Sequence, residues 1–251
     1  MNAVAIVQAR MGSSRLPGKV LADVAGRTML ERVVTRARAA RRVDEVVVAT
    51  SVAPEDDRVN ALCGELGIGV FRGSPSDVLD RFAGAASRFA ADPIVRLTAD
   101  CPLLDPGVVD AVVARYEEGG VDYAANINPP TFPDGLDTEV FSAEALARAA
   151  REARRPSERE HVTLYIRNHP ESFRIANVRG PRDLSGLRWT VDEPEDLELV
   201  CGIYAALGGA EFGTEDVVRL LAERPELAAV NARFERDEGL RRSLRSEEAG
   251  A

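Results

Sequence analysis

The chain has 251 residues, of which 45% are hydrophobic and 29% are charged, a composition typical of globular proteins. Its net charge of −9 disfavours a nucleic-acid partner, and no apolar run approaches the ~18 residues that a membrane span requires. The start lacks a basic region followed by an apolar one, so we expect no secretory leader. The three cysteines are widely spaced and match no disulfide framework or zinc site, which favours a reducing, cytoplasmic setting.

The first twenty residues contain the clearest functional signal. A short apolar run at residues 4–7 predicts a buried parallel strand, and it leads into the loop Gln-Ala-Arg-Met-Gly-Ser-Ser-Arg-Leu-Pro-Gly-Lys at 8–19. Small residues let backbone N–H groups approach an anion, and Arg10, Arg15 and Lys19 suit a polyphosphate. Lys19 is the only lysine in the chain, which favours a functional role over chance. The spacing matches neither a P-loop nor a dinucleotide-binding fingerprint.

After this loop, helices and strands alternate. The sequence predicts a helix from a cap at Thr28 to about 41, a strand at 44–50, a helix at 54–67, a strand at 68–71, a helix at 77–90, a strand at 94–97, a helix at 106–117 and a strand at 123–127. Such alternation indicates an α/β fold with a mostly parallel, doubly wound sheet. Because ligands bind beyond the carboxyl ends of such strands, the 8–19 loop and the 98–102 turn should meet in one cleft.

The alternation loosens between residues 128 and 178. A Pro-rich loop at 128–135 is followed by a strand-like run at 139–141, helices at 143–154 and 158–168, and a strand-like run at 173–178. We interpret 128–178 as a small α+β lobe inserted into a single domain of residues 1–251. A strand at 187–192 should then resume the sheet, followed by helices at 194–207 and 214–223, and the charged tail after Phe234 should fray.

Two aspartates follow strand-like runs that lie far apart in the sequence. Asp100 follows the strand at 94–97, and Asp192 ends the run at 187–192. Mg²⁺ in phosphate sites is typically held by one or two carboxylates together with phosphate oxygens and water, so this pair could bind it. The alternatives are that Asp100 is a turn residue and that Asp192 caps the helix that begins at Pro194.

The 8–19 motif resembles that of the cytidylyltransferases that make CMP-activated acidic sugars, which include the CMP-Kdo and CMP-sialic acid synthetases. The resemblance extends from about Ala3 to Leu207, and the spore-coat polysaccharide branch is the most similar. It implies a Rossmann-like, GT-A-like nucleotidyltransferase fold in which the loop holds the triphosphate of CTP. Asp100 and Asp192 match the metal-binding aspartates of that family.

The resemblance also implies roles for individual residues. The nucleotide-binding residues would be Gln8, Ala9, Arg10, Met11, Gly12, Ser13, Arg15, Lys19, Thr50, Ser51, Arg72 and Asp100. Lys19, Arg10 and Asp100 would be catalytic, while Asp100 and Asp192 would hold Mg²⁺. Arg72 could equally be an ordinary surface arginine.

The acceptor-binding parts of the family would correspond to Arg96, Asp137, Glu139, Arg159 and His161. Arg96 lies in an otherwise apolar strand and therefore requires a partner, which could be Asp77, Asp100 or an anionic ligand. The two lobe acids could instead be solvated residues of an edge strand. The 98–102 turn, Thr-Ala-Asp-Cys-Pro, differs from the Gly-Asp-Glu-Pro of CMP-Kdo synthetases, which leaves the acceptor open.

The resemblance thus implies a Mg²⁺-dependent cytidylyltransferase that acts as a homodimer through the 128–178 lobe. It would transfer CMP from CTP to an acidic sugar of the nonulosonate or Kdo type, or to a similar small acid, and release pyrophosphate. A phosphonate cytidylyltransferase and a GT-A-like glycosyltransferase are the enzymatic alternatives, although the latter usually carries an Asp-x-Asp motif that is missing at Asp100-Cys-Pro. A nucleotide-sensing module is the non-enzymatic alternative.

Overall fold

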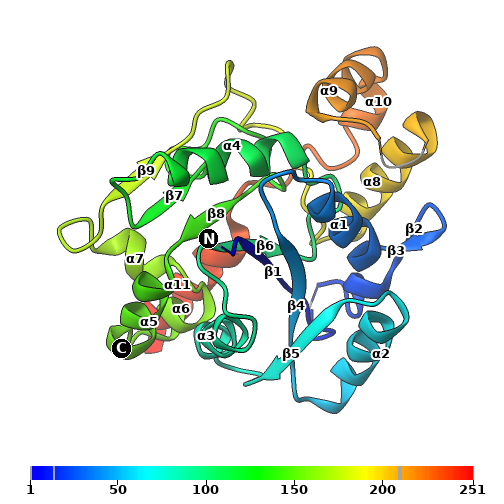
Figure 1. Ribbon diagram of the computed structural model, residues 1–251. Coiled ribbons are helices and arrows are strands. Elements are labelled where there is room, and N and C mark those ends of the chain that lie inside the picture. Colours follow the sequence, from blue (N-terminus) through cyan, green and yellow to red (C-terminus); the bar gives the residue numbers. More distant parts are fainter. Residues whose placement is uncertain (1, 14, 209–210, 251) are drawn as a thin grey trace.

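The computed structural model describes residues 2–13, 15–208 and 211–250. Its centre is a seven-stranded sheet in the order β5-β4-β1-β6-β8-β7-β9 (Figure 1). The strands are β1 (Val4–Gln8), β4 (Glu45–Ser51), β5 (Gly69–Gly73), β6 (Ile94–Thr98), β7 (Tyr123–Ala125), β8 (Glu139–Phe141) and β9 (Ile175–Asn177). Only β8 runs antiparallel to its neighbours β6 and β7, while the other pairs are parallel. The mostly parallel α/β sheet is therefore confirmed.

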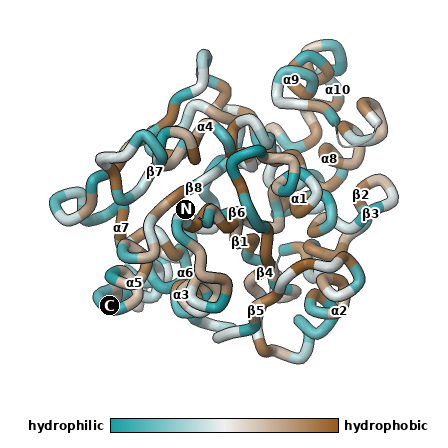
Figure 2. Tube along the Cα trace, in the orientation of Figure 1, coloured by the Kyte–Doolittle hydropathy of each residue, from teal (hydrophilic) through white to brown (hydrophobic). Residues whose placement is uncertain are grey.

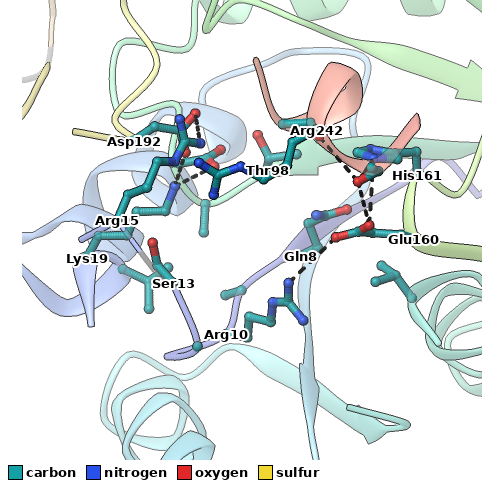
Figure 3. Close-up of a pocket in the computed structure, with 18 of the residues that line it drawn as sticks. Gln8, Arg10, Ser13, Arg15, Lys19, Thr98, Glu160, His161, Asp192 and Arg242 are labelled. Carbon is teal, nitrogen blue, oxygen red and sulfur yellow. Dashed lines mark hydrogen bonds and ion pairs between the residues drawn. The ribbon is translucent and has the colours of Figure 1, made fainter. Parts of the chain in front are cut away.

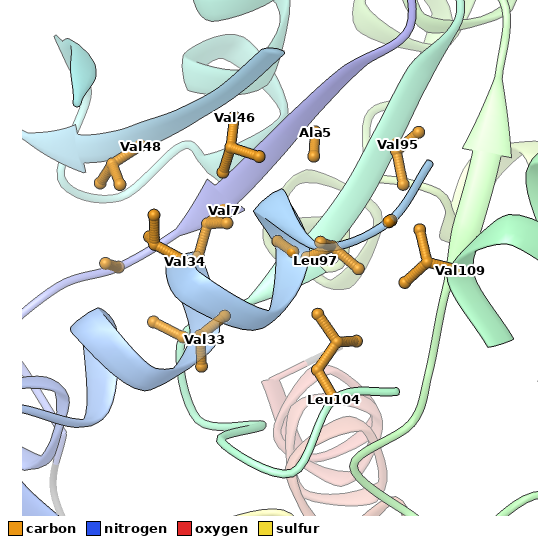
Figure 4. Close-up of a cluster of buried hydrophobic side chains, with 14 of the residues drawn as sticks. Ala5, Val7, Val33, Val34, Val46, Val48, Val95, Leu97, Leu104 and Val109 are labelled. Atoms are coloured by element: carbon orange, nitrogen blue, oxygen red, sulfur yellow. The ribbon is translucent and has the colours of Figure 1, made fainter. Parts of the chain in front are cut away.

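Helices cover both faces of the sheet because successive strand residues point to opposite sides. On one face, Ala5 and Val7 of β1 pack with α1 (Met29–Arg38) and α4 (Pro106–Glu117), as Figure 4 shows, and α2 (Asp57–Glu65) belongs to the same cluster. On the other face, Val4 and Ile6 pack with α3 (Val78–Arg88) and α5 (Ala143–Glu152). Figure 2 shows hydrophobic residues concentrated along the central strands.

Side-chain caps fix where the helices begin after these strands. The Thr28 hydroxyl accepts a hydrogen bond from the backbone of Glu31 at the start of α1, at 3.2 Å. Asp77 caps α3 in the same way, accepting from the backbone of Asp80 at 2.9 Å. Such caps satisfy backbone donors that the first helical turn leaves free, so the connecting loops end at defined positions.

A third cluster of buried side chains lies beside the sheet, around Trp189 and Tyr204. It is formed mainly by α8 (Pro194–Leu207), α9 (Thr214–Glu223), α10 (Pro225–Ala228) and the hairpin β2 (Asp23–Val24) with β3 (Arg27–Thr28). The chain then returns as α11 (Glu238–Gly250) to lie beside α6 (Pro156–Glu160), as Figure 1 shows. Among the described residues, none of the helices combines the length and the apolar character that a bilayer crossing needs.

The segment 187–192 does not extend the sheet, so that prediction was wrong. It makes a single bridge, from Arg188 to Asp134. The backbone N–H groups of Trp189 and Thr190 bond to the carbonyl of Asp134, whereas that of Val191 bonds to the carbonyl of Asp100. Because the segment bonds to two different loops, it crosses the ends of the strands instead of pairing along one.

Two further expectations need correction. The helix expected at 158–168 is divided into α6 and α7 (Leu164–Asn168), because Val162 between them adopts a positive φ of 42°. The tail after Phe234 forms α11, and Glu247 ties this helix to Ser157 and Arg155. The segment 128–178 supplies β8 and β9 to the main sheet together with α5, α6 and α7. Its role in dimerisation stays a prediction.

Candidate active site

A cavity of about 260 Å³ opens at the carboxyl ends of β1 and β6, where the predicted cleft should lie (Figure 3). Its walls come from the loop after β1, the turn after β6, the start of α3, the end of α6, the segment before α8, and α11. The lining residues are Gln8, Ala9, Arg10, Gly12, Ser13, Arg15, Lys19, Val20, Val78, Arg81, Thr98, Ala99, Asp100, Glu160, His161, Asp192, Gly239, Arg242 and Ser243.

Lys19 connects the two predicted metal-binding carboxylates. Its ammonium nitrogen lies 2.9 Å from Oδ2 of Asp100 and 2.7 Å from Oδ1 of Asp192, and it also donates to the carbonyl of Val191 at 2.8 Å. The lysine side chain is only 9% exposed, so all three of its donors are used inside the protein. Gly18, with a φ of 72°, makes the turn that directs the chain into the short 3-10 helix Lys19–Leu21.

The charges of this cluster stabilise one another. Burial alone would lower the pKa of Lys19, but the charges of Asp100 and Asp192 outweigh it and raise that pKa above its ordinary value. Burial would likewise raise the pKa of Asp100, but the Lys19 ammonium and a hydrogen bond from Thr98 hold it at about 2. Lys19 and Asp100 are therefore both charged throughout the neutral pH range.

The two loop arginines are held differently. Arg15 contacts Oδ2 of Asp192 at 2.9 Å, Glu193 at 3.2 Å and Glu238 of α11 at 2.9 Å. Arg10 is 44% exposed, and its contacts are a carboxylate oxygen of Glu160 at 4.0 Å and a carbonyl oxygen at 3.5 Å. Arg10 is thus freer than Arg15 to meet an incoming anion.

Asp192 does not cap α8, because the N-cap is Glu193. Asp192 is instead positioned by the buried Asp196, whose carboxylate accepts its backbone N–H at 2.9 Å. Asp196 also binds Arg188 at 3.0 Å and the side-chain amide of Asn231 at 2.8 Å. This bracing directs the Asp192 carboxylate toward the cavity, where Oδ1 accepts from Lys19 and Oδ2 contacts Arg15.

The residues present fit a hard divalent cation. Two carboxylates from separate loops converge on one ammonium nitrogen, so this position already accommodates positive charge. The described part of the chain holds no cluster of three or more acidic, histidine or cysteine ligands. Asp100 and Asp192 would therefore supply two ligands and leave the remaining positions to phosphate oxygens and water, as Mg²⁺ prefers.

Four of the predicted nucleotide-binding residues lie outside the cavity, namely Met11, Thr50, Ser51 and Arg72. Thr50 is fully buried, and Arg72 donates to the carbonyl of Ser51 at 3.0 Å. The backbone N–H of Met11 donates to the buried carboxylate of Asp56 at 2.7 Å, and Ser51 donates to the same carboxylate through its backbone and its hydroxyl. Asp56, which sequence reasoning assigned only to a helix start, thus anchors the loop to β4.

Arg96 and Glu139 form a buried ion pair next to the cavity. The expected partners of Arg96, Asp77 and Asp100, were wrong, because Arg96 pairs with Glu139 and donates to the side-chain oxygen of Gln8 at 3.1 Å. Nor is Glu139 a solvated edge residue, since it is 2% exposed. Burial would raise the pKa of Glu139, but the adjacent Arg96 outweighs this and lowers it.

The other predicted acceptor residues are distributed around the site. Asp137 pairs with Arg236, just before α11, and burial raises the pKa of Asp137 to about 6. Arg159 donates to Asp77 at 2.7 Å and does not line the cavity. His161 is the one residue of this group that lines the cavity, and its Nε2 lies 3.0 Å from Oγ of Ser243.

Nine lining residues were not among the individually predicted site residues, although two of them lie in the 98–102 turn that was expected at the cleft. They are Val20, Val78, Arg81, Thr98, Ala99, Glu160, Gly239, Arg242 and Ser243. Several are immediate neighbours of predicted residues, so the strand–loop pattern could have found them. The three from α11 were missed because the tail was expected to fray, although Leu240 and Leu244 have the i, i+4 spacing of an amphipathic helix.

Comparison with known proteins agrees with this geometry. The cytidylyltransferase family model matches residues 4–202. The chain is 36% identical to the spore coat polysaccharide biosynthesis protein SpsF of Bacillus subtilis, over 89% of this chain and 95% of that protein. It is 37% identical to 3-deoxy-manno-octulosonate cytidylyltransferase of Anaeromyxobacter sp., over 80% of this chain and 97% of that protein.

A solved structure is also similar along most of the chain. The structure of a cytidylyltransferase from Leptospira borgpetersenii superimposes with a TM-score of 0.87 at 33% sequence identity, covering 91% of this chain and 97% of that one. The family model covers the loop after β1, the turn after β6 and the segment that holds Asp192, which together bring Lys19 and its two aspartates into contact. The chain therefore belongs to the cytidylyltransferase family.

Proposed function

We propose that the protein transfers CMP from CTP to an acidic sugar of the nonulosonate or 3-deoxy-manno-octulosonate type and releases pyrophosphate. The observation that carries this proposal is the contact of Lys19 with both Asp100 and Asp192, beneath a loop that also presents Arg10 and Arg15. A relative named as a 3-deoxy-manno-octulosonate cytidylyltransferase and another named for spore coat polysaccharide biosynthesis support an acidic sugar as acceptor.

In this proposal the loop binds the triphosphate. Arg10 and Arg15, with Gly12 and Ser13 of the same loop, line the cavity where the phosphate oxygens would bind, and the exposed Arg10 guanidinium is the group best placed to donate to them. The phosphates compete with Asp100 and Asp192 for Lys19, whose flexible stem lets the ammonium follow the departing pyrophosphate. An acceptor oxygen attacks the α-phosphorus, the bond to the pyrophosphate oxygen breaks, and the acceptor's proton leaves to solvent or to a nearby base.

Asp100 and Asp192 would hold Mg²⁺ in this reaction. The ion would offset charge on the phosphates and lower the pKa of the acceptor hydroxyl. Both carboxylates are presented at a fixed position, Asp100 by the turn after β6 and Asp192 by the brace through Asp196. Before ligands bind, the adjacent Lys19 ammonium holds the pKa of Asp100 at about 2, so this carboxylate meets the incoming ion in its charged form.

The proposal includes a cytoplasmic homodimer. The setting is supported by the three cysteines, which are all unpaired. The dimer would use the 128–178 segment, which forms the β9 edge of the sheet and borders the cavity through His161 and Glu160. An edge strand presents unpaired backbone groups, which a second copy could cover.

Pyrophosphate release tests the proposed reaction. The protein is incubated with Mg²⁺, with CTP, UTP, ATP or GTP in turn, and with 3-deoxy-manno-octulosonate or N-acetylneuraminate as acceptor. We expect release from CTP only, dependent on the acid, and lost in Asp100→Asn. Turnover of a nucleotide sugar, or equal release from all four triphosphates, would contradict the proposal and favour a glycosyltransferase or an unspecific site.

A further inference from the structure

The C-terminal helix α11 lies over the mouth of the cavity and contributes Gly239, Arg242 and Ser243 to its lining (Figure 3). This helix lies beyond residue 202, where the family match ends. The cavity is thus completed by an element that the family model does not include. We propose that α11 is part of the nucleotide site and that Arg242 binds a phosphate of the nucleotide. This inference rests on the proposed function.

Three sets of contacts hold α11 in place. Glu238, its first residue, accepts from Arg15 of the loop at 2.9 Å. One turn later, Oγ of Ser243 donates to Glu160 at 2.7 Å and lies 3.0 Å from Nε2 of His161. Near the end, Glu247 accepts from the backbone of Ser157 at 2.6 Å. The helix therefore connects the loop after β1 with the end of α6 across the cavity.

Arg242 differs from the other basic residues of the lining. Five cationic side chains line the cavity, and Arg10, Arg15, Lys19 and Arg81 each have a protein partner. Within the described part of the chain, Arg242 makes no hydrogen bond or ion pair. Figure 3 shows its side chain extending from α11 into the cavity. The donors of this guanidinium group are therefore available to an oxyanion such as phosphate.

The charge and position of Arg242 favour phosphate. The five lining cations face three lining carboxylates, those of Asp100, Glu160 and Asp192, and two further carboxylates, Glu193 and Glu238, contact Arg15. None of these five carboxylates, which all belong to the described residues, is within ion-pair distance of Arg242, so its charge is available to an anion. Arg242 and Arg15 also line a second cavity together, so the two arginines border the same space. An anion bound to Arg10 and Arg15 of the loop would thus also come near Arg242 of α11.

Binding of CTP and of cytidine tests the inference without requiring turnover. Isothermal titration in Mg²⁺ buffer compares the wild type with Arg242→Gln, Arg242→Lys and Arg245→Gln. Arg245 is the control, because it is an exposed arginine on the same helix that lines the second cavity but not the main one. Arg242 is also exposed, so its replacement should not disturb folding.

We expect Arg242→Gln to weaken CTP binding about tenfold or more, since a charge-assisted hydrogen bond is lost, and to leave cytidine binding unchanged. Arg242→Lys should retain part of the affinity, and Arg245→Gln should stay within about twofold of wild type. The role of Arg242 is overturned if Arg242→Gln binds CTP as tightly as wild type, or if Arg245→Gln loses as much CTP affinity as Arg242→Gln. Either outcome leaves the proposed function standing. A wild type that binds CTP no better than cytidine overturns the proposed function as well.

Discussion

At the scale of residues, the site keeps its charges paired. Lys19 bonds to Asp100 and Asp192, and Arg15 bonds to Asp192, Glu193 and Glu238. A triphosphate would have to replace carboxylates around these cations, whereas a metal ion would replace the ammonium between the aspartates. Ligand binding thus exchanges partners within the cluster and does not require the burial of new unpaired charge.

Replacement of Lys19 tests its role in turnover. Lys19→Ala should lower kcat by about a hundredfold or more, as expected when a charge donor for the transition state is removed. Lys19→Arg should restore little, because a planar guanidinium cannot reproduce three bonds from one nitrogen in a side chain that is 9% exposed. Initial rates of pyrophosphate release measure both variants, and full activity in Lys19→Arg would refute the argument.

The two aspartates provide a second test at this scale. Asp100→Asn and Asp192→Asn should each nearly abolish turnover, because each removes a charged ligand from the cation position. EDTA should do the same to the wild type, with recovery on added Mg²⁺. Asp183→Asn, in an exposed loop, is the control and should be fully active. Circular dichroism checks that the variants fold. Turnover that EDTA does not reduce would show that the reaction needs no metal ion at Asp100 and Asp192.

At the scale of elements, a buried brace positions the segment before α8. Arg188 and Asp196 are 5% and 0% exposed at their side chains, and their ion pair fixes the backbone of Asp192 and Glu193. Removal of one partner leaves the other buried and uncompensated, which is far more costly than loss of an exposed pair. The position of the Asp192 carboxylate therefore depends on Asp196, which does not itself line the cavity.

Asp196→Asn should lower the free energy of unfolding by about 3 kcal/mol and reduce kcat through a displaced Asp192. Glu215→Gln is the control, because its ion pair with Arg182 is exposed and should contribute at most about 1 kcal/mol. Urea denaturation measures both variants. Equal unfolding free energies in Asp196→Asn and wild type would show that the brace does not stabilise the fold.

Much of the architecture follows from sequence periodicity. The apolar run at 4–7, the cap at Thr28 and the β–α alternation are local signals, and they placed the loops after β1 and β6 correctly. The segment 187–192 has the apolar alternation of a strand, but its partners are two distant loops that local pattern does not reveal. The packing of α11 on α6 is also long-range, which is why Arg242 and Ser243 were missed.

At the scale of the whole molecule, the 128–178 segment forms one end of the sheet, with β9 at the edge. If this end is covered by a second copy, the protein should sediment as one species of twice the 27.1 kDa chain mass at micromolar concentration. Sedimentation velocity measures this mass. A single species near 27.1 kDa would rule out the dimer and leave the edge strand to solvent.

The central claim is that the cavity at the ends of β1 and β6 is the CTP site. A crystal structure with CTP and Mn²⁺ in place of Mg²⁺ tests it most directly, because the anomalous signal locates the ion independently of the nucleotide. We expect Mn²⁺ bound to Asp100 and Asp192, the triphosphate against residues 10–19, and Lys19 moved from the carboxylates onto phosphate. Nucleotide density elsewhere, or Lys19 still bonded to both aspartates with CTP bound, would contradict it.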